Sequence, residues 1–164
     1  MTGRGHVLKI GLVALVAFAT VGFGFYRYVD SFKGSYGTYA VLPDGTKITV
    51  ALAKTDEERA RGLSGRDSLG DNEGMYFIFP REDRYGFWMK DMRFPIDILW
   101  IQRGELVGVE QDTPPEPGKS DMELMIYHPP EPVTTVLELK AGSAERYHLK
   151  TGDKVRVQIV PQKR

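Results

Sequence analysis

Apolar and polar residues alternate along many short segments of this 164-residue chain, with the period of two that is typical of half-buried β-strands. Ile48, Val50 and Leu52, for example, are separated by polar or small residues. The sequence Pro-Asp-Gly at 43–45 favours a turn, so the segments on either side of it are expected to form a hairpin. The predicted strands are residues 38–42, 47–53, 74–79, 85–90, 96–102, 105–111, 133–140 and 154–159.

Two short helices are predicted between these strands. Thr55 and Glu58 have the spacing of a capping box, and Gly62 ends the first helix after about two turns. The second helix is expected at residues 141–147. Short strands joined by hairpins predict a mainly β domain, built as a single antiparallel sandwich or half-open barrel with one or two short helices.

The N-terminal part of the chain has a different character. Residues 10–26 are uncharged and largely apolar, which is near the lower limit of about 17–25 residues for a transmembrane helix. Ala17-Phe18-Ala19 instead fits the cleavage site of a signal peptide, although the apolar run continues past it. A buried helix of a soluble domain is the third alternative.

Because Arg4 and Lys9 precede the run, we expect a cytoplasmic N-terminus and an extracytoplasmic domain. The predicted organisation is residues 1–9 in the cytoplasm, 10–26 as a single-pass anchor or signal peptide, 27–37 as a linker and 38–164 as the β domain.

Composition excludes several classes of function. The chain has 22 basic and 22 acidic residues, so no basic surface is expected to attract nucleic acid. It has no cysteine, which excludes disulfides, thiol nucleophiles and cysteine-ligated zinc. It also lacks a nucleophile elbow, an HExxH motif and a glycine-rich phosphate loop.

Residues 113–132 form a proline-rich loop that holds six of the ten prolines. A loop of this length usually has a function or is ordered by its own packing. Met122, Met125 and His128 follow one another at three-residue spacing, and thioether and imidazole groups suit Cu(I). The two prolines that follow His128 argue against a helix that would align the three side chains, and methionine more often fills gaps in a core. We therefore expect no metal and no cofactor.

Trp88 and Lys90 are the first candidates for a ligand site. In a strand they would share one face, opposite Phe87 and Met89. An exposed indole beside a cation suits stacking on a flat ligand or a sugar ring, with Lys90 or Arg66 holding an anionic group. The alternative is that Trp88 packs beneath the proline-rich loop.

Asp97 is the second candidate. It shares one face of a predicted central strand with Leu99 and Ile101, where a carboxylate is costly unless it is paired or hydrogen-bonded. A structural role would be to hold the turn at 91–95. A functional role would be that of a site carboxylate whose pKa is perturbed by its surroundings. Its candidate partners are Lys90, Arg59, Arg66 and the backbone amides of that turn.

Five blocks of the sequence together resemble one known family. In order they are LAKTDEERARGL (52–63), GMYFIF (74–79), FWMKDMRFPIDILWI (87–101), VLELKAG (136–142) and GDKV (152–155). Over residues 46–160 the chain is similar to the family called domain of unknown function 192. The resemblance implies a small, mainly β domain, often behind a signal or anchor, with no established activity.

The chain departs from the pattern of that family at two places. Ser64-Gly65 stands where the family usually has a methionine and a bulkier residue, and Asp91-Met92 stands where it usually has Asn-Thr. If these positions line a site, the changes make it smaller or more acidic.

The sequence therefore predicts a membrane-anchored extracytoplasmic binding or accessory domain for a small anionic or sugar-like ligand. The expected site is a cleft between the Arg59 helix, the Trp88–Lys90 strand and the proline-rich loop. Two alternatives remain open: a hydrolase-type enzyme that uses Asp97 as acid or base, and an envelope module that binds a protein through residues 113–132. We expect a monomer whose partners are the membrane and the ligand, and not nucleic acid. The candidate ligand-binding residues are Arg59, Arg66, Trp88, Lys90 and Asp97.

Overall fold

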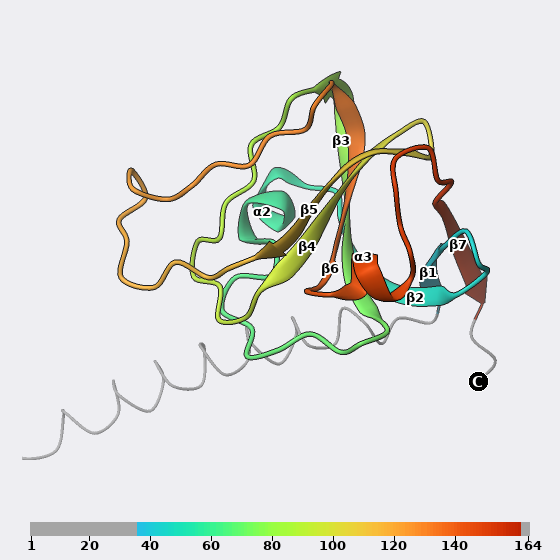
Figure 1. Cartoon of the computed structure of the whole chain (residues 1–164), viewed down its shortest axis with the longest axis horizontal. Coiled ribbons are helices and arrows are strands. Elements are labelled where there is room, and N and C mark those ends of the chain that lie inside the picture. The colour runs from blue at the N-terminus through green and yellow to red at the C-terminus, as the bar shows by residue number, and fades with distance from the viewer. Residues whose placement is uncertain (1–35, 162–164) are drawn as a thin grey trace, which may run out of the picture.

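The computed structural model describes residues 36–161, and within this range seven strands form one open sheet (Figure 1). The strand order is β5-β4-β6-β3-β2-β1-β7. Two short helices, α2 and α3, accompany the sheet. The strands are β1 (Tyr36–Val41), β2 (Lys47–Ala53), β3 (Glu73–Asp83), β4 (Ile96–Gln102), β5 (Glu105–Thr113), β6 (Val133–Lys140) and β7 (Arg156–Pro161).

The prediction of a mainly β domain with short helices is confirmed, and the architecture is a single open sheet. All neighbouring strands are antiparallel except β2 and β3, which are parallel. The expectation of a wholly antiparallel fold is wrong at this pair. A parallel pair needs a long crossover connection, and residues 54–72, which include α2 (Asp56–Arg61), supply it.

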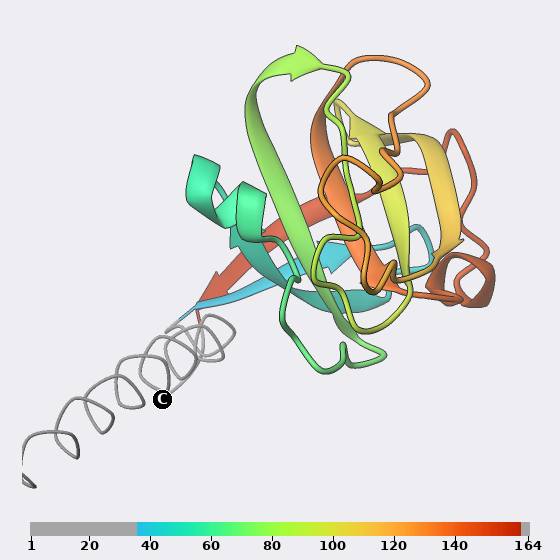
Figure 2. The same ribbon diagram turned by 90° about the vertical axis from the view of Figure 1, so that its left-hand side faces the viewer.

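The two ends of the strand order approach each other without closing the sheet. Figure 2 shows β1, β2 and β7 running at a steep angle to β3, β6 and β4, so the sheet twists strongly. Just before β7, Lys154 forms an isolated bridge with Glu105 at the start of β5. There the Leu106 amide donates to the Asp153 carbonyl at 2.8 Å.

Residues 85–90 do not form the predicted strand. They are an extended connection that makes one isolated bridge, in which Phe87 and Tyr127 exchange two backbone hydrogen bonds of 2.9 and 2.8 Å. The segment lies against the proline-rich loop and not against a strand of the sheet, which is why the pairing stops after one bridge. β3 is correspondingly longer than predicted, because it continues past Pro80 to Asp83.

The sheet has two apolar faces, and each has its own core. Ile96, Ile98 and Trp100 of β4 point to one face, which α2 and residues 85–92 cover; we call it the cleft face. The residues between them point to the other face, which carries α3 (Ser143–Arg146); we call it the α3 face. The large buried side chains of the cleft face include Phe77, Phe87, Met89, Met92 and Trp100, and those of the α3 face include Leu99, Ile101, Leu137, Leu139 and Leu149.

Local sequence accounts for both helices. The capping box of α2 is confirmed: the Glu58 amide donates to Thr55 Oγ1 at 3.2 Å, and the Thr55 amide donates to Glu58 Oε2 at 2.9 Å. Gly62 follows α2 with a φ of 51°, a left-handed conformation that favours glycine. α3 is shorter than the predicted helix at 141–147 and begins after Gly142.

The predicted anchor at residues 10–26 lies outside the described range. Among residues 36–161, no helix is long and apolar enough to span a membrane.

Candidate functional site: an aromatic cleft with a glutamate at its floor

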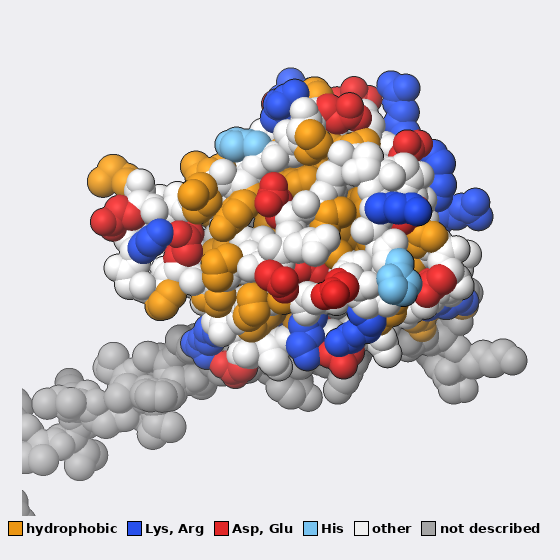
Figure 3. Space-filling view, viewed as in Figure 1, with side chains coloured by type: hydrophobic (Ala, Val, Ile, Leu, Met, Phe, Trp, Pro, Cys, Tyr) orange, Lys and Arg blue, Asp and Glu red, His pale blue; other side chains and the backbone are white. Residues whose placement is uncertain are grey.

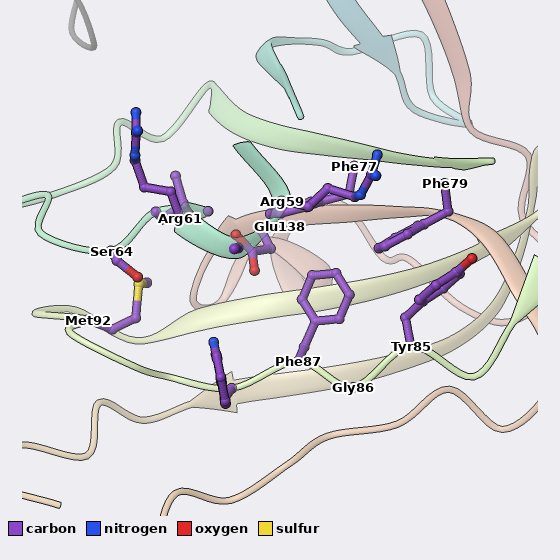
Figure 4. A pocket seen from close by; sticks show the side chains of 14 residues that line it. Arg59, Arg61, Ser64, Phe77, Phe79, Tyr85, Gly86, Phe87, Met92 and Glu138 are labelled. Atoms are coloured by element: carbon purple, nitrogen blue, oxygen red, sulfur yellow. The ribbon is translucent and has the colours of Figure 1, made fainter. Parts of the chain in front are cut away.

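A cleft of about 200 Å³ opens on the cleft face between α2 and residues 85–92 (Figure 4). We call it the aromatic cleft, because aromatic rings from β3 and from the extended connection form much of its lining. On the α2 side it is lined by the residues from Arg59 to Ser64. Its aromatic residues are Phe77, Phe79, Tyr85, Phe87 and Trp88.

The aromatic rings hold one another in place. Phe79 and Tyr85 are stacked, with ring centroids 3.6 Å apart and an interplanar angle of 12°. Phe87 contacts Phe77 edge to face, with centroids 5.0 Å apart, and meets Trp100 in the same way at 5.3 Å. Stacked and edge-to-face pairs are the arrangements that the ring quadrupoles favour. The cleft therefore has rigid apolar walls that suit a flat organic group.

Arg59 joins α2 to the sheet at the edge of the cleft. Its guanidinium donates to the Ile78 carbonyl at 2.8 Å and also to the Lys54 carbonyl and the Asp56 carboxylate. It lies 5.3 Å from the centre of the Phe79 ring. Because these partners occupy its N–H groups, Arg59 positions the cleft wall more than it offers a charge to a ligand.

The floor of the aromatic cleft carries a carboxyl group that the sequence reasoning did not select. Glu138 lies on β6, between Met75 of β3 and Ile98 of β4 in the strand register. It lines the cleft although only 6% of it is exposed, and Figure 4 shows its carboxyl group between α2 and the Phe87 ring. Within residues 36–161, its Oε2 atom has no hydrogen-bond partner.

The surroundings of Glu138 favour its neutral form. Burial raises the pKa of its carboxyl to about 8, and the positive charge of Arg66 opposes this rise only in part. An ionised carboxylate without donors on one oxygen would be costly in this apolar setting. Glu138 is thus a largely protonated acid at neutral pH.

Glu138 could have been selected from the sequence only if its strand had been recognised as a central one. It stands between Leu137 and Leu139, in a strand that has a neighbour on each side and an apolar core on each face. A charged residue in such a strand needs an explanation, and the same reasoning selected Asp97. Alternation along the strand made Glu138 resemble a solvent-facing residue.

Asp97 lies on the α3 face, away from the aromatic cleft. It is fully buried, and its Oδ2 accepts from the Ala144 amide at 2.7 Å. Its Oδ1 accepts from the Asp112 amide at 2.9 Å and from the Gly142 amide at 3.3 Å. The carboxylate thereby joins the end of β5 to the start of α3.

Both predicted roles of Asp97 are therefore corrected. It does not hold the turn at 91–95, because its amide donors come from two other segments. It does not open into the cleft as an acid or base, because alternation along β4 turns it to the opposite face from Ile98.

Of the two alternatives for Trp88, the structure has the outward-facing one: Trp88 and Lys90 point outward together, although their segment is not a strand. Phe87 and Met89 are buried between and beside them, whereas Trp88 is 42% exposed and lines the cleft. The Lys90 ammonium lies 5.7 Å from the centre of the Trp88 ring and 2.5 Å from the Asp121 carboxylate. This hydrogen bond raises the pKa of Lys90, so its charge has a partner in the proline-rich loop.

The structure thus brings together only part of the predicted site. Arg59 and Trp88 line the aromatic cleft, and Arg66 is close enough for its charge to act on Glu138. Lys90 lies beside Trp88 and Asp97 lies on the other face. The proline-rich loop, expected as the third wall, supplies none of the described residues that line the cleft.

The described side chains offer no cluster of three or more histidine, cysteine, aspartate or glutamate residues that could hold a metal ion. Of the Met122, Met125 and His128 series, both methionines are exposed. The Nδ1 atom of His128 lies 3.3 Å from the Arg84 carbonyl oxygen.

Fold and site together define a small mainly β domain with one open sheet and, on one face, an aromatic cleft over a buried carboxyl group. The chain belongs to the DUF192 family (Uncharacterized ACR), whose model matches residues 39–157. The resemblance seen in the sequence is confirmed.

Two solved structures resemble this chain, each at 30% sequence identity. One is a putative transcription regulator from Sinorhizobium meliloti 1021, with a TM-score of 0.65 over 76% of this chain and 96% of that one. The other is a protein of unknown function from Novosphingobium aromaticivorans DSM 12444, with a TM-score of 0.64 over 73% of this chain and 83% of that one. No curated protein matches the sequence.

Proposed function

We propose that this domain binds a small organic molecule, anionic or sugar-like, in the aromatic cleft. The observation that carries the proposal is the Oε2 atom of Glu138, which is buried at the floor and has no hydrogen-bond partner in the described part of the chain. Such an atom costs about 1–3 kcal/mol of stability. Because Glu138 lies at a cleft of about 200 Å³, a bound ligand could supply the hydrogen bond that this atom lacks.

The lining of the cleft supports a ligand with a flat apolar side. Phe77, Phe79 and Phe87 offer ring faces and edges, and the exposed Trp88 extends this surface to solvent. Aromatic rings and the apolar faces of sugars both stack on such surfaces. The positive charge of Arg66, which acts on the floor of the cleft, favours a ligand that carries negative charge.

We also propose that the domain is extracytoplasmic and tethered by one N-terminal helix, with the N-terminus in the cytoplasm. This part rests on the sequence, in which Arg4 and Lys9 precede the apolar run at 10–26. The function would then be that of a binding or accessory domain at the cell membrane.

Methionine methyl NMR of the full chain in detergent tests the proposed binding. Met92 lines the cleft, whereas Met122 is 96% exposed on the proline-rich loop, so one reports on the site and the other serves as an internal control. Small ring compounds and monosaccharides are added one at a time. Binding in the cleft shifts the Met92 methyl resonance and leaves that of Met122 unchanged. If no compound shifts Met92, or if both methyls shift together, the proposal is wrong.

A second function, binding of an envelope protein, has its own observation. The proline-rich loop projects from the domain (Figure 1), and hydrophobic side chains lie on the surface of this projection (Figure 3). Met122, Met125 and Ile126 are exposed on it. Exposed methionines adapt well to protein partners. Replacing all three with serine should abolish capture of a partner and leave the spectrum of the domain intact; unchanged capture would exclude this function.

The Sinorhizobium protein is described as a putative transcription regulator, but we do not propose nucleic-acid binding for this chain. The sequence has balanced charges. The helices α2 and α3 have six and four residues, too short to present a recognition surface in a DNA groove.

A further inference from the structure

We infer that the ligand of the aromatic cleft presents an acceptor oxygen, carbonyl or carboxylate, to the protonated carboxyl group of Glu138. This inference rests on the proposed function and names the chemistry that the floor of the cleft selects.

The surroundings of Glu138 determine which hydrogen-bond partner suits its Oε2 atom. The neighbouring strands place Met75 and Ile98 beside it, and Phe87 and Met92 line the cleft above it. An ionised carboxylate would need hydrogen-bond donors here, and the Oε2 atom has none among the described residues. A protonated carboxyl needs only one acceptor for its O–H group. Burial also raises the pKa of Glu138 to about 8, so the proton is held at neutral pH.

The charged groups around the cleft argue against the rival ligand, an amine cation. Aromatic rings with a carboxylate can bind ammonium groups. Here α2 contributes Arg59 and Arg61 to the lining, and the loop after α2 contributes the charge of Arg66. The connection 85–92 contributes one further titratable group to the lining, the phenol of Tyr85. Because Arg59 is paired with Asp56, the charge that acts at the floor is that of Arg66, which repels an amine, does not oppose a carbonyl and attracts a carboxylate.

The experiment uses three probes that share one ring and differ in the polar group: acetophenone, benzoate and benzylamine. Each is titrated into the full chain in detergent at pH 6 and pH 9, with the Met92 methyl as reporter. Acetophenone and benzoate should bind at pH 6, and benzylamine should bind far more weakly. A carboxyl with a pKa of about 8 is about 99% protonated at pH 6 and about 10% at pH 9. The affinity for acetophenone should therefore fall about tenfold between these pH values.

Benzoate distinguishes the two sources of the acceptor oxygen. Its affinity should fall by more than that of acetophenone, because the ionised Glu138 repels a carboxylate as well as losing its O–H group. Stronger binding of benzoate than of acetophenone at pH 6 assigns the site to carboxylates, and the opposite order assigns it to neutral carbonyl compounds. Either order supports the inference.

Two variants test whether Glu138 is the donor. Glu138→Gln keeps an N–H donor at the same place without a titrating proton, so acetophenone should still bind and its affinity should no longer depend on pH. Glu138→Leu removes the donor and should weaken acetophenone about tenfold, the value of one hydrogen bond. Equal affinity in wild type and Glu138→Leu would overturn the inference. So would preferential binding of benzylamine that strengthens as the pH rises, although the proposed function would survive. Only a failure of every probe to shift Met92 would overturn the proposed function itself.

Discussion

Asp97 and Glu138 are buried carboxyl groups on adjacent strands, β4 and β6, but they face opposite sides of the sheet. On the α3 face, three backbone amides donate to Asp97. On the cleft face, Glu138 lines the aromatic cleft, and its Oε2 atom has no donor from the described residues. Both side chains are buried, and they differ in the number of backbone amides that donate to the carboxyl group. The supply of donors decides whether a carboxyl group stabilises the fold or is left available to a ligand.

The segments that cover the two faces of the sheet explain why Asp97 has amide donors and the Oε2 atom of Glu138 has none among the described residues. The chain turns at Gly142, and this turn with the start of α3 directs the amides of Gly142 and Ala144 toward Asp97. The cleft face has α2 and an extended connection at the corresponding place, and these direct guanidinium and aromatic side chains toward the cleft.

The largest change in the stability of the domain is expected from Asp97→Ala. This change leaves the amides of Asp112, Gly142 and Ala144 without their acceptor in a buried place. We expect a loss of roughly 3–5 kcal/mol in the free energy of unfolding, measured by urea denaturation at neutral pH. A loss below about 1 kcal/mol would show that the carboxylate does not hold the α3 face together.

The next largest effect is the pH dependence of stability that Glu138 causes. The folded state raises the pKa of Glu138 from 4.5 to about 8, so it binds this proton more tightly than the unfolded chain does. The contribution of this proton to the free energy of unfolding is therefore complete below about pH 4.5, and it is lost as the pH rises to about 8. The stability of wild type relative to Glu138→Gln should fall over this window, by an amount on the order of a few kcal/mol. A constant difference in urea midpoints between pH 4.5 and 8 would contradict this prediction.

A matched pair of amide substitutions makes the comparison at a single pH. Asp97→Asn replaces an acceptor oxygen with a donor that meets other donors, and should cost about 1–3 kcal/mol at pH 7. Glu138→Gln keeps a neutral group at the floor of the cleft and removes the ionisation of Glu138 that favours the unfolded wild-type chain at this pH, so it should stabilise the domain by on the order of a few kcal/mol. Thermal unfolding of both variants under one condition gives the two values. Equal losses would remove the distinction between the two carboxyl groups.

The smallest effect is expected from Arg66→Gln. The charge of Arg66 favours the ionised form of Glu138, so its removal should move the pKa of that carboxyl further upward. A pH titration of Glu138 in this variant measures the shift, with Lys90→Gln as a control, because the ammonium of Lys90 is bound to Asp121. A downward shift in Arg66→Gln would show that another group governs the protonation of Glu138.

Much of the fold could be predicted from local sequence. The Pro-Asp-Gly turn, the capping box of α2, β4 and β6 all depend on residues close together in the chain, and the structure has them as expected. The parallel pairing of β2 with β3 could not be predicted in this way, because strand partners are chosen by packing across the whole domain. The structure of residues 85–90 could not be predicted in this way either. Their apolar and polar residues alternate as in a strand, but the segment pairs with the proline-rich loop and not with the sheet.

The candidate site was predicted less well, and for a related reason. The alternation around Trp88 correctly separated outward from inward side chains. Alternation also predicted that Asp97 is buried, but it gave no information on which face of the sheet holds a cleft. It passed over Glu138, because a carboxyl group on an alternating strand resembles a solvated one until the neighbours on both sides are known.

The most direct test of the central claim is a pH titration of the Glu138 side-chain carboxyl by ¹³C NMR, with the resonance assigned by its absence in Glu138→Gln. We expect a midpoint near pH 8, because burial in the aromatic cleft disfavours the charged form of the carboxyl. A ligand with an acceptor oxygen should move the midpoint higher still. A midpoint near the ordinary value of 4.5 would contradict the account, since Glu138 would then be ionised at neutral pH and could not act as a donor.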